Sequence, residues 1–318
     1  MKKVETQKKN MTMKKIFSLI AAIAISVGAM AQQEIMISQY MFNGLVLNPA
    51  YAGSHPYFGA SILHRSQWVG FEGAPTTQTF AIDGPLANRR LGIGLNFSND
   101  KIGVTSQQDI GVNFSAKVST GRGRLAAGIR VGGAFYSARL NDLVTFDAND
   151  PTHSANIQSQ FIPKFGAGLY YYERNWFAGI SMPVIFAMDD EILPTVTVNE
   201  RFFRSHTYLN AGYVYEHSSV FAVKPSVLIK YQGEAPLQAD INCNLLFFNK
   251  FWLGAGYRTG DAMVVMAEWN ITEMFRLGYA YDLTTTDIGN YSTGSHEVML
   301  GVDFGKDVNL KVRSPRYF

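Results

Sequence analysis

From residue 57 onward, apolar residues alternate with small or polar residues along most of the chain. In one segment the apolar positions are Leu91, Ile93, Leu95 and Phe97. Near the end of the chain they are Val298, Leu300, Val302 and Phe304. Successive side chains of a β-strand point to opposite faces of its sheet. The pattern therefore predicts strands with one apolar face and one small or polar face.

Fourteen segments of the chain show this alternation, and their lengths cluster near the roughly 9–11 residues that a tilted membrane strand needs. They are 57–65, 76–83, 91–99, 109–119, 124–136, 163–172, 176–182, 207–216, 221–231, 238–248, 251–258, 262–270, 274–283 and 296–305. An even number of short alternating strands is typical of an antiparallel β-barrel. Pro225 lies in the middle of one segment, so we expect a bulge or break there.

The lengths of the connections favour a transmembrane barrel over a soluble sandwich. Connections after the even-numbered strands are short, whereas those after strands 1, 3, 5, 7 and 13 are longer, especially 137–162 and 183–206. Connections after strands 9 and 11 are modest and weaken the contrast. Short turns at one end and long loops at the other are typical of outer-membrane barrels, and they place both termini at the periplasmic end.

Aromatic residues near the predicted strand ends fit the girdles that meet lipid headgroups. They are Trp176, Tyr213, Tyr215, Tyr231, Phe251, Tyr257, Tyr279 and Tyr281. The alternative is that these rings fill a protein core. Cys243 shares the apolar face with Ile241 and Leu245, which indicates an inert thiol facing lipid.

The opposite face collects charged residues of both signs. They are Lys117, Arg124, Arg130, Glu216, Lys224, Lys230, Asp240, Arg258, Glu268, Arg276, Asp282, Glu297 and Asp303. Mixed charges indicate a salt-bridge network that fills a narrow lumen. A conducting channel, in which such charges tune selectivity, is the alternative.

The segment 32–56 does not alternate, although it is rich in apolar residues such as Ile37, Met41 and Leu45. Pro49 disfavours a helical conformation at Asn48, so an element is expected to end there. We expect this segment to enter the barrel as a small plug; a frayed segment or a linker to another protein is the alternative. The predicted organisation is then a signal peptide (1–31), a plug (32–56), a barrel (57–306) and a periplasmic tail (307–318).

The first 31 residues have the three parts of a secretory signal peptide. Lys14 and Lys15 precede an apolar stretch over 16–28, and Ala29 and Ala31 form a small-residue cleavage site. The stretch is too short to span a bilayer. Cleavage would remove six lysines and one glutamate and change the net charge from +3 to −2. A mature chain that is slightly acidic gives no support for nucleic-acid binding.

Composition and motifs do not indicate an enzyme. Charged residues make up only 17% of the chain, the single Cys excludes an internal disulfide, and the six His are scattered. We find no phosphate loop or dinucleotide fingerprint and expect no cofactor. Acidic residues at 147–150 and 189–191 suit solvated loops better than a divalent cation site.

Three groups of residues resemble the PorP/SprF family of outer-membrane proteins. The first and most specific is Tyr40, Met41, Phe42 and Asn43, followed by Asn48, Pro49, Ala50, Tyr51, Ala52 and Gly53. The second comprises Arg65, residues 67–71 and residues 73–77. The third comprises residues 295–300 and 314–318. The resemblance extends over essentially the whole mature chain.

This resemblance implies a Bacteroidota outer-membrane protein of the type IX secretion system, linked to gliding motility. It also implies likeness to FadL-type fatty-acid transporters, which have fourteen strands and an N-terminal hatch with an Asn-Pro-Ala element, here Asn48, Pro49 and Ala50. Partners implied by the family are exported adhesins or their C-terminal domains and periplasmic OmpA-like peptidoglycan-binding proteins, besides membrane lipids.

The leading functional hypothesis is a non-enzymatic barrel that helps to export or anchor surface proteins. A FadL-like channel for hydrophobic molecules, with the plug as its gate, is the alternative. A third hypothesis, a purely structural barrel, predicts neither a secretion defect nor an uptake defect.

Overall fold

The computed structural model describes residues 35–86, 89–142, 156–187, 205–233 and 235–305. The chain divides into two compact units, one of Met1–Gln33 with Gly233–Ala235, the other of Glu34–Gln232 with Pro236–Phe318. All helices and strands below belong to the second unit. The predicted signal peptide, the predicted C-terminal tail and the acidic runs at 147–150 and 189–191 lie outside the described residues.

The described residues form fifteen strand segments that account for fourteen positions in the wall. The segments are β1 (Phe58–Ser66), β2 (Thr76–Leu86), β3 (Leu91–Ile102), β4 (Thr105–Thr120), β5 (Gly123–Ala138), β6 (Ile157–Tyr172), β7 (Trp176–Ala187), β8 (Thr207–Tyr213), β9 (Tyr215–Glu216), β10 (Phe221–Tyr231), β11 (Gln238–Phe247), β12 (Phe251–Arg258), β13 (Ala262–Asn270), β14 (Phe275–Thr284) and β15 (Ser295–Phe304). Segments β8 and β9 are separated by Val214 alone and both pair with β10, so they form one interrupted strand.

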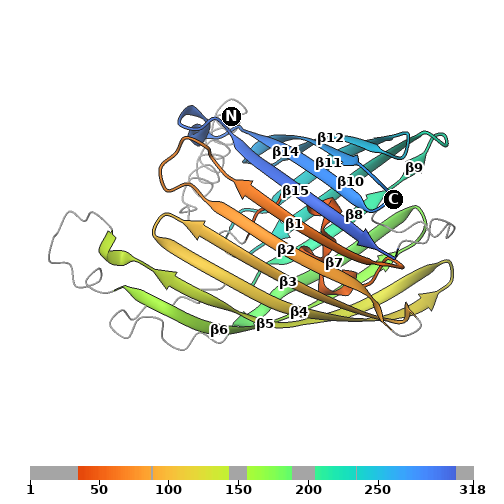
Figure 1. Ribbon diagram of the computed structural model, residues 1–318, viewed down its shortest axis with the longest axis horizontal. Coiled ribbons are helices and arrows are strands. Elements are labelled where there is room, and N and C mark those ends of the chain that lie inside the picture. Colours follow the sequence, from red (N-terminus) through yellow and green to blue (C-terminus); the bar gives the residue numbers. More distant parts are fainter. Residues whose placement is uncertain (1–34, 87–88, 143–155, 188–204, 234, 306–318) are drawn as a thin grey trace, which may run out of the picture. The chain divides into compact units, whose positions relative to one another are not determined.

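Pairing closes the sheet on itself. Each strand pairs antiparallel with its neighbours in the chain, β10 pairs with β11, and β15 pairs with β1 from Phe58↔Phe304 to Ser66↔His296 (Figure 1). Lipid offers no hydrogen-bond partners, so a spanning sheet must close to leave no unpaired edge. The predicted closed antiparallel barrel of fourteen strands is therefore confirmed.

Pro225 does not interrupt its own strand, contrary to our expectation. It stays in register opposite Cys243 of β11, while the break falls at Val214 in the neighbouring strand. The Val214 amide instead donates to the Asn175 carbonyl over 2.6 Å. Proline has no N–H to offer on that side, so the adjacent strand is the one that loses its pairing.

The hairpin between β3 and β4 also differs from the expectation of a long third connection. Pairing continues to Ile102↔Thr105, and the turn is formed by Gly103 and Val104, with Gly103 at φ 55°. Polar residues at the ends of both strands had indicated a loop. Backbone pairing does not require apolar side chains outside the bilayer, so the ladder extends beyond the apolar segment.

The two faces of the wall have the chemistry that the alternation predicts. Leu95 and Leu300 are 37% and 54% exposed on the outer face, whereas Asn96 is buried in the interior. Six of the eight girdle candidates are exposed near strand ends, as predicted. Tyr279 is also exposed, but it lies in the middle of β14, and Tyr281 is half-buried. Cys243 lies exposed on the same outer face as Ile241. No helix among the described residues is long and apolar enough to cross a membrane.

The N-terminal segment of the described chain occupies the interior as three short elements. These are η1 (Tyr40–Phe42), α2 (Gly44–Leu47) and η2 (Pro49–Tyr51). η2 contacts β4, β5 and β6, and α2 contacts β2, β3 and β7. Their apolar side chains form clusters with inward-facing residues of the wall, including Leu63, Trp252 and Met299. We call residues 35–57 the plug.

The outward orientation of Leu95 can be tested by substitution. Leu95→Arg is expected to lower the free energy of unfolding in lipid by about 2–4 kcal/mol, because a cation near the bilayer midplane is poorly solvated. The loop variant Glu72→Arg, at an exposed position in the β1–β2 connection, is expected to change it by about 0.5 kcal/mol or less. Urea titration in vesicles measures both, and equal losses would contradict the assigned orientation.

Candidate functional site

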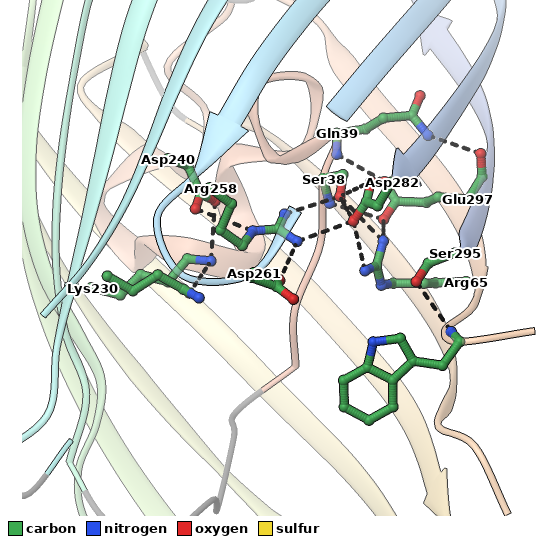
Figure 2. A network of polar contacts seen from close by, with 12 residues as sticks. Ser38, Gln39, Arg65, Lys230, Asp240, Arg258, Asp261, Asp282, Ser295 and Glu297 are labelled. Atoms are coloured by element: carbon green, nitrogen blue, oxygen red, sulfur yellow. Dashed lines mark hydrogen bonds and ion pairs between the residues drawn. The ribbon is translucent and has the colours of Figure 1, made fainter. Parts of the chain in front are cut away.

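The first residues of the plug are bound by charges from four strands (Figure 2). Glu297 of β15 accepts hydrogen bonds from the backbone amides of Ser38, over 2.9 Å, and Gln39, over 2.8 Å. Arg65 of β1 pairs with the same carboxylate at 3.3 Å and with Asp282 of β14 at 2.8 Å. The carboxylate of Glu297 thus neutralises Arg65 and also satisfies two plug amides.

The hydroxyl of Ser38 lies at the centre of this group. It donates to Asp282 over 2.8 Å and accepts from Arg65 over 3.1 Å and from Arg258 of β12 over 3.0 Å. A serine hydroxyl has one donor and two acceptor positions, so all are used. Because Ser38 belongs to the plug and its partners belong to the wall, the hydroxyl joins the two parts.

Arg258 extends the network along the wall (Figure 2). Its guanidinium lies 3.1 Å from Asp240, 3.1 Å from Asp261 and 3.0 Å from Asp282. Lys230 joins through Asp240 at 3.1 Å. A buried cation is tolerated only where carboxylates and hydrogen bonds replace water, and the planar guanidinium suits several acids at once. We call Ser38, Gln39, Arg65, Lys230, Asp240, Arg258, Asp261, Asp282 and Glu297 the plug lock.

Two further contacts hold the middle of the plug. The ammonium of Lys224, on β10, lies 5.8 Å from the Phe42 ring centroid, 5.7 Å from Phe177 and 5.8 Å from Trp252. These distances permit cation–π attraction from plug and wall together. Asn242 donates to the Tyr40 hydroxyl over 2.7 Å, which attaches the plug to β11.

The Asn-Pro-Ala element fastens the far end of the plug. The Asn48 side chain accepts from the Ala50 amide over 2.9 Å and donates to the Leu169 carbonyl of β6 over 3.0 Å. One side chain therefore caps η2 and attaches it to the wall. Ser181 of β7 donates to the Leu47 carbonyl over 2.7 Å, a further link between plug and wall.

Gly53, near the end of the plug, has φ 60°. Its amide donates to Asp83 over 2.8 Å, and its carbonyl accepts from Lys117. Ser115 of β4 donates to the Ala52 carbonyl over 2.6 Å. Inward-facing polar side chains thus take the place of water as hydrogen-bond partners of the buried backbone in this turn.

Glycines in the wall let η2 lie directly against the strands. A Cβ added to Gly128 of β5 would lie 2.3 Å from the Ala50 nitrogen, and one added to Gly168 of β6 would lie 2.2 Å from the Asn48 side-chain oxygen. Both distances are shorter than a van der Waals contact. Only glycine fits at these two positions while the plug stays in place.

The predicted lumen residues are distributed between the plug lock and two separate groups. Arg130 and Lys164 pair with Asp109, the latter at 2.6 Å. Arg276 lies 3.6 Å from both Glu268 and Asp303. All these residues and Lys117 are buried. Arg124 differs: it is exposed, because it is the second residue of β5 and lies at the rim of the barrel.

The predicted plug residues lie together inside the barrel. Tyr40, Asn43, Asn48, Pro49, Ala50, Tyr51 and Gly53 are all buried. The Tyr51 ring packs edge-on against Tyr170 of β6 with 5.6 Å between centroids. The sequence analysis missed Ser38 and Gln39, for which no periodicity exists. It also missed the inward orientation of Arg65, which the spacing of Ser61, Leu63 and Arg65 would have revealed.

The contacts described above attach the plug to the wall of the barrel. Within the described ranges, no group of three or more His, Cys, Asp or Glu side chains is arranged to hold a metal ion. The site consists of ion pairs and amide contacts between a short segment and a closed wall. Breaking them would free the plug while leaving the backbone pairing of the barrel unchanged.

Fold and site together define a plugged β-barrel of the membrane class. The chain belongs to the family described as type IX secretion system membrane protein PorP/SprF, whose model matches residues 29–302. This membership and the barrel fit an outer-membrane location.

Similarity to individual proteins is slight. No curated protein sequence matches the chain. Solved structures to which the chain is similar include the Acinetobacter baumannii outer-membrane protein Omp33, with a TM-score of 0.45 at 10% identity over 78% of this chain and 99% of that chain. A substituted porin from Rh. blastica has a TM-score of 0.34 at 9% identity over 78% and 99%. The fold assignment rests on the strand pairing.

Glu297→Gln tests the plug lock. The substitution removes the negative charge that pairs with Arg65 and accepts hydrogen bonds from two plug amides. We therefore expect the interaction between plug and wall to weaken by about 1–3 kcal/mol. Planar-bilayer recording should then show higher conductance than the parent protein. Glu72→Gln, an exposed loop carboxylate, is the control and should conduct like the parent. Unchanged conductance in a correctly folded Glu297→Gln barrel would exclude a role for this carboxylate in closure.

Gly128→Val tests the close approach of η2 to the wall. The new side chain would overlap the Ala50 backbone. Such overpacking destabilises the arrangement by about 1–3 kcal/mol, so we expect the plug to be displaced. Chymotrypsin should then cleave at Tyr40 or Phe42, which are buried in the parent protein. Ala127→Val, the neighbouring outward position, should stay protected. Equal protection of both variants would show that the plug can move aside without leaving the lumen.

Proposed function

We propose that this chain is a non-enzymatic outer-membrane component of the type IX secretion and gliding machinery that helps to export or anchor surface proteins. Family membership over residues 29–302 carries the proposal. The plug supports it: a segment fastened at both ends inside the barrel is unsuited to free diffusion of solutes. An N-terminal signal peptide that is cleaved on export is part of the proposal.

Ordered loops at one end of the barrel offer a surface for an exported protein. The β1–β2 and β14–β15 connections are joined by hydrogen bonds from the Val69 amide to Gly294 and from the Thr293 amide to Val69, each over 2.8 Å. Phe71 and Tyr291 are 49% and 73% exposed there. Exposed aromatic side chains on a rigid backbone are typical of contact surfaces. We assign this end to the exported adhesin or its C-terminal domain.

Short turns at the other end suit a periplasmic partner. They include the β4–β5 turn at Gly121 and the β11–β12 turn at Asn249, both with positive φ. An OmpA-like peptidoglycan-binding protein, together with other secretion components, is the class of partner we propose for this end. Such an attachment would connect the barrel to the cell wall.

A channel for hydrophobic molecules is the second candidate function. The observation in its favour is the apolar cluster between plug and wall, which includes Ile37, Met41, Val264 and Met266. Displacement of the plug would expose this apolar surface to the lumen. In this case the plug lock would act as the gate of a transport path.

Complementation of a deletion strain separates the two functions. The parent gene should restore surface display of exported proteins, and Phe71→Ser with Tyr291→Ser should restore it poorly, because the contact surface loses both rings. Val265→Ala, on the outer face of β13 and away from both ends of the barrel, is the control and should restore display fully. Whole-cell labelling of surface proteins and uptake of a radiolabelled long-chain fatty acid are measured in parallel. Normal surface display in the deletion strain would contradict the secretion role, and lost uptake with normal display would support the channel.

A further inference from the structure

The outer wall of the barrel carries an apolar groove of about 620 Å³ across β3 to β7. Its rim is formed by large exposed side chains, namely Leu91, Phe114, Ile129, Leu169, Ile180 and Ile185. These residues lie on the face that the alternation assigns to lipid. The groove therefore opens toward the hydrocarbon region and not toward the lumen.

Small residues at successive outward positions create the groove. Ala116 of β4 lies opposite Ala127 of β5, and Ala167 of β6 lies opposite Ile129. On the other side of the barrel, the equivalent outward pair Leu245↔Leu253 presents two large side chains. The indentation thus follows from residue size and needs no change in strand pairing.

The plug lies directly behind the floor of this groove. Gly128 and Gly168 belong to the groove lining, and their inner sides face Ala50 and Asn48 of the plug. The outward residues of the wall here are alanines and the inward residues are glycines. The wall between the lipid and the plug therefore consists of little more than backbone. A molecule seated in the groove therefore supports the part of the wall against which η2 packs.

Shape and chemistry select a hydrocarbon chain as the occupant. The volume of the groove falls within the roughly 300–1,000 Å³ of small-molecule sites. The lining is almost entirely apolar, so it offers a headgroup little hydrogen bonding. In lipid there is no hydrophobic driving force, and retention depends on van der Waals contact with the floor and both rims.

We propose that the groove over Ala116, Ala127 and Ala167 is a binding site for one acyl chain of a membrane lipid, located behind the plug. The proposal deepens the expected contact with membrane lipids by giving it a place on the wall. It does not depend on the secretion role.

Photocrosslinking in nanodiscs tests the site. The probe is a phosphatidylcholine with a diazirine midway along one acyl chain, diluted in phosphatidylcholine and phosphatidylglycerol. We expect the crosslinking yield on β4 to β7 to exceed that on the outer face of β12 and β13 by about tenfold. A tenfold difference corresponds to ~1.4 kcal/mol of additional van der Waals attraction between the acyl chain and the groove. Mass spectrometry of the digested barrel assigns the labelled residues.

Variants that fill the groove provide the decisive comparison. Ala127→Phe, or the milder Ala116→Leu if the first fails to fold, should lower the β4–β7 yield to the level of β12 and β13. Ala255→Phe, at an outward alanine of β12 outside the groove, should leave the yield unchanged. Uniform labelling of the parent, or labelling that Ala127→Phe and Ala116→Leu do not change, would overturn the proposal. A dimer in native mass spectrometry of the parent protein that Ala127→Phe abolishes would assign the groove to a second copy and overturn it as well.

Discussion

The position of the plug inside this barrel depends on how the charges around it are neutralised. Removing a charge from water is costly, so every lumen cation needs carboxylates, carbonyls or aromatic faces around it. Arg65 and Arg258 meet this need only in part through the wall, and Ser38 of the plug supplies an acceptor for both. Glu297 in turn completes its coordination with the plug amides. Plug and wall are therefore each incompletely paired without the other.

The same logic explains the contrast between the two ends of the plug. A network of ion pairs from β1, β12, β14 and β15 holds its start, whereas the hydroxyls of Ser115 and Ser181, the side chain of Asn48 and the separate charges of Asp83 and Lys117 hold its end. Ion pairs respond to competing charges, and a backbone pressed onto Gly128 and Gly168 responds to changes in wall shape.

Much of the fold and part of the site were predictable from local pattern. Alternation located the strands, and the same parity placed Arg130, Arg258, Glu268 and Asp303 inside the barrel, where they are buried. Arg124 shows that alternation alone does not predict burial. Its position in the strand is that of a lumen-facing residue, but it lies at the rim of the barrel and is exposed to water. The β3–β4 hairpin shows another limit, because polar strand ends beyond the bilayer look like loops although their backbones pair.

The sequence by itself determined the class of this protein, because burial in lipid imposes a period of two that is readable at every strand. It also determined which residues face inward. Only the tertiary structure decided which of them meet: Ser38 and Glu297 are 259 positions apart in the chain and are joined by closure of the ring. Which inward charges pair with one another depends on strand register and strand order. Neither can be read from a local pattern in the sequence. The fit of Asn48 and Ala50 against two glycines likewise exists only when the wall has closed around the plug.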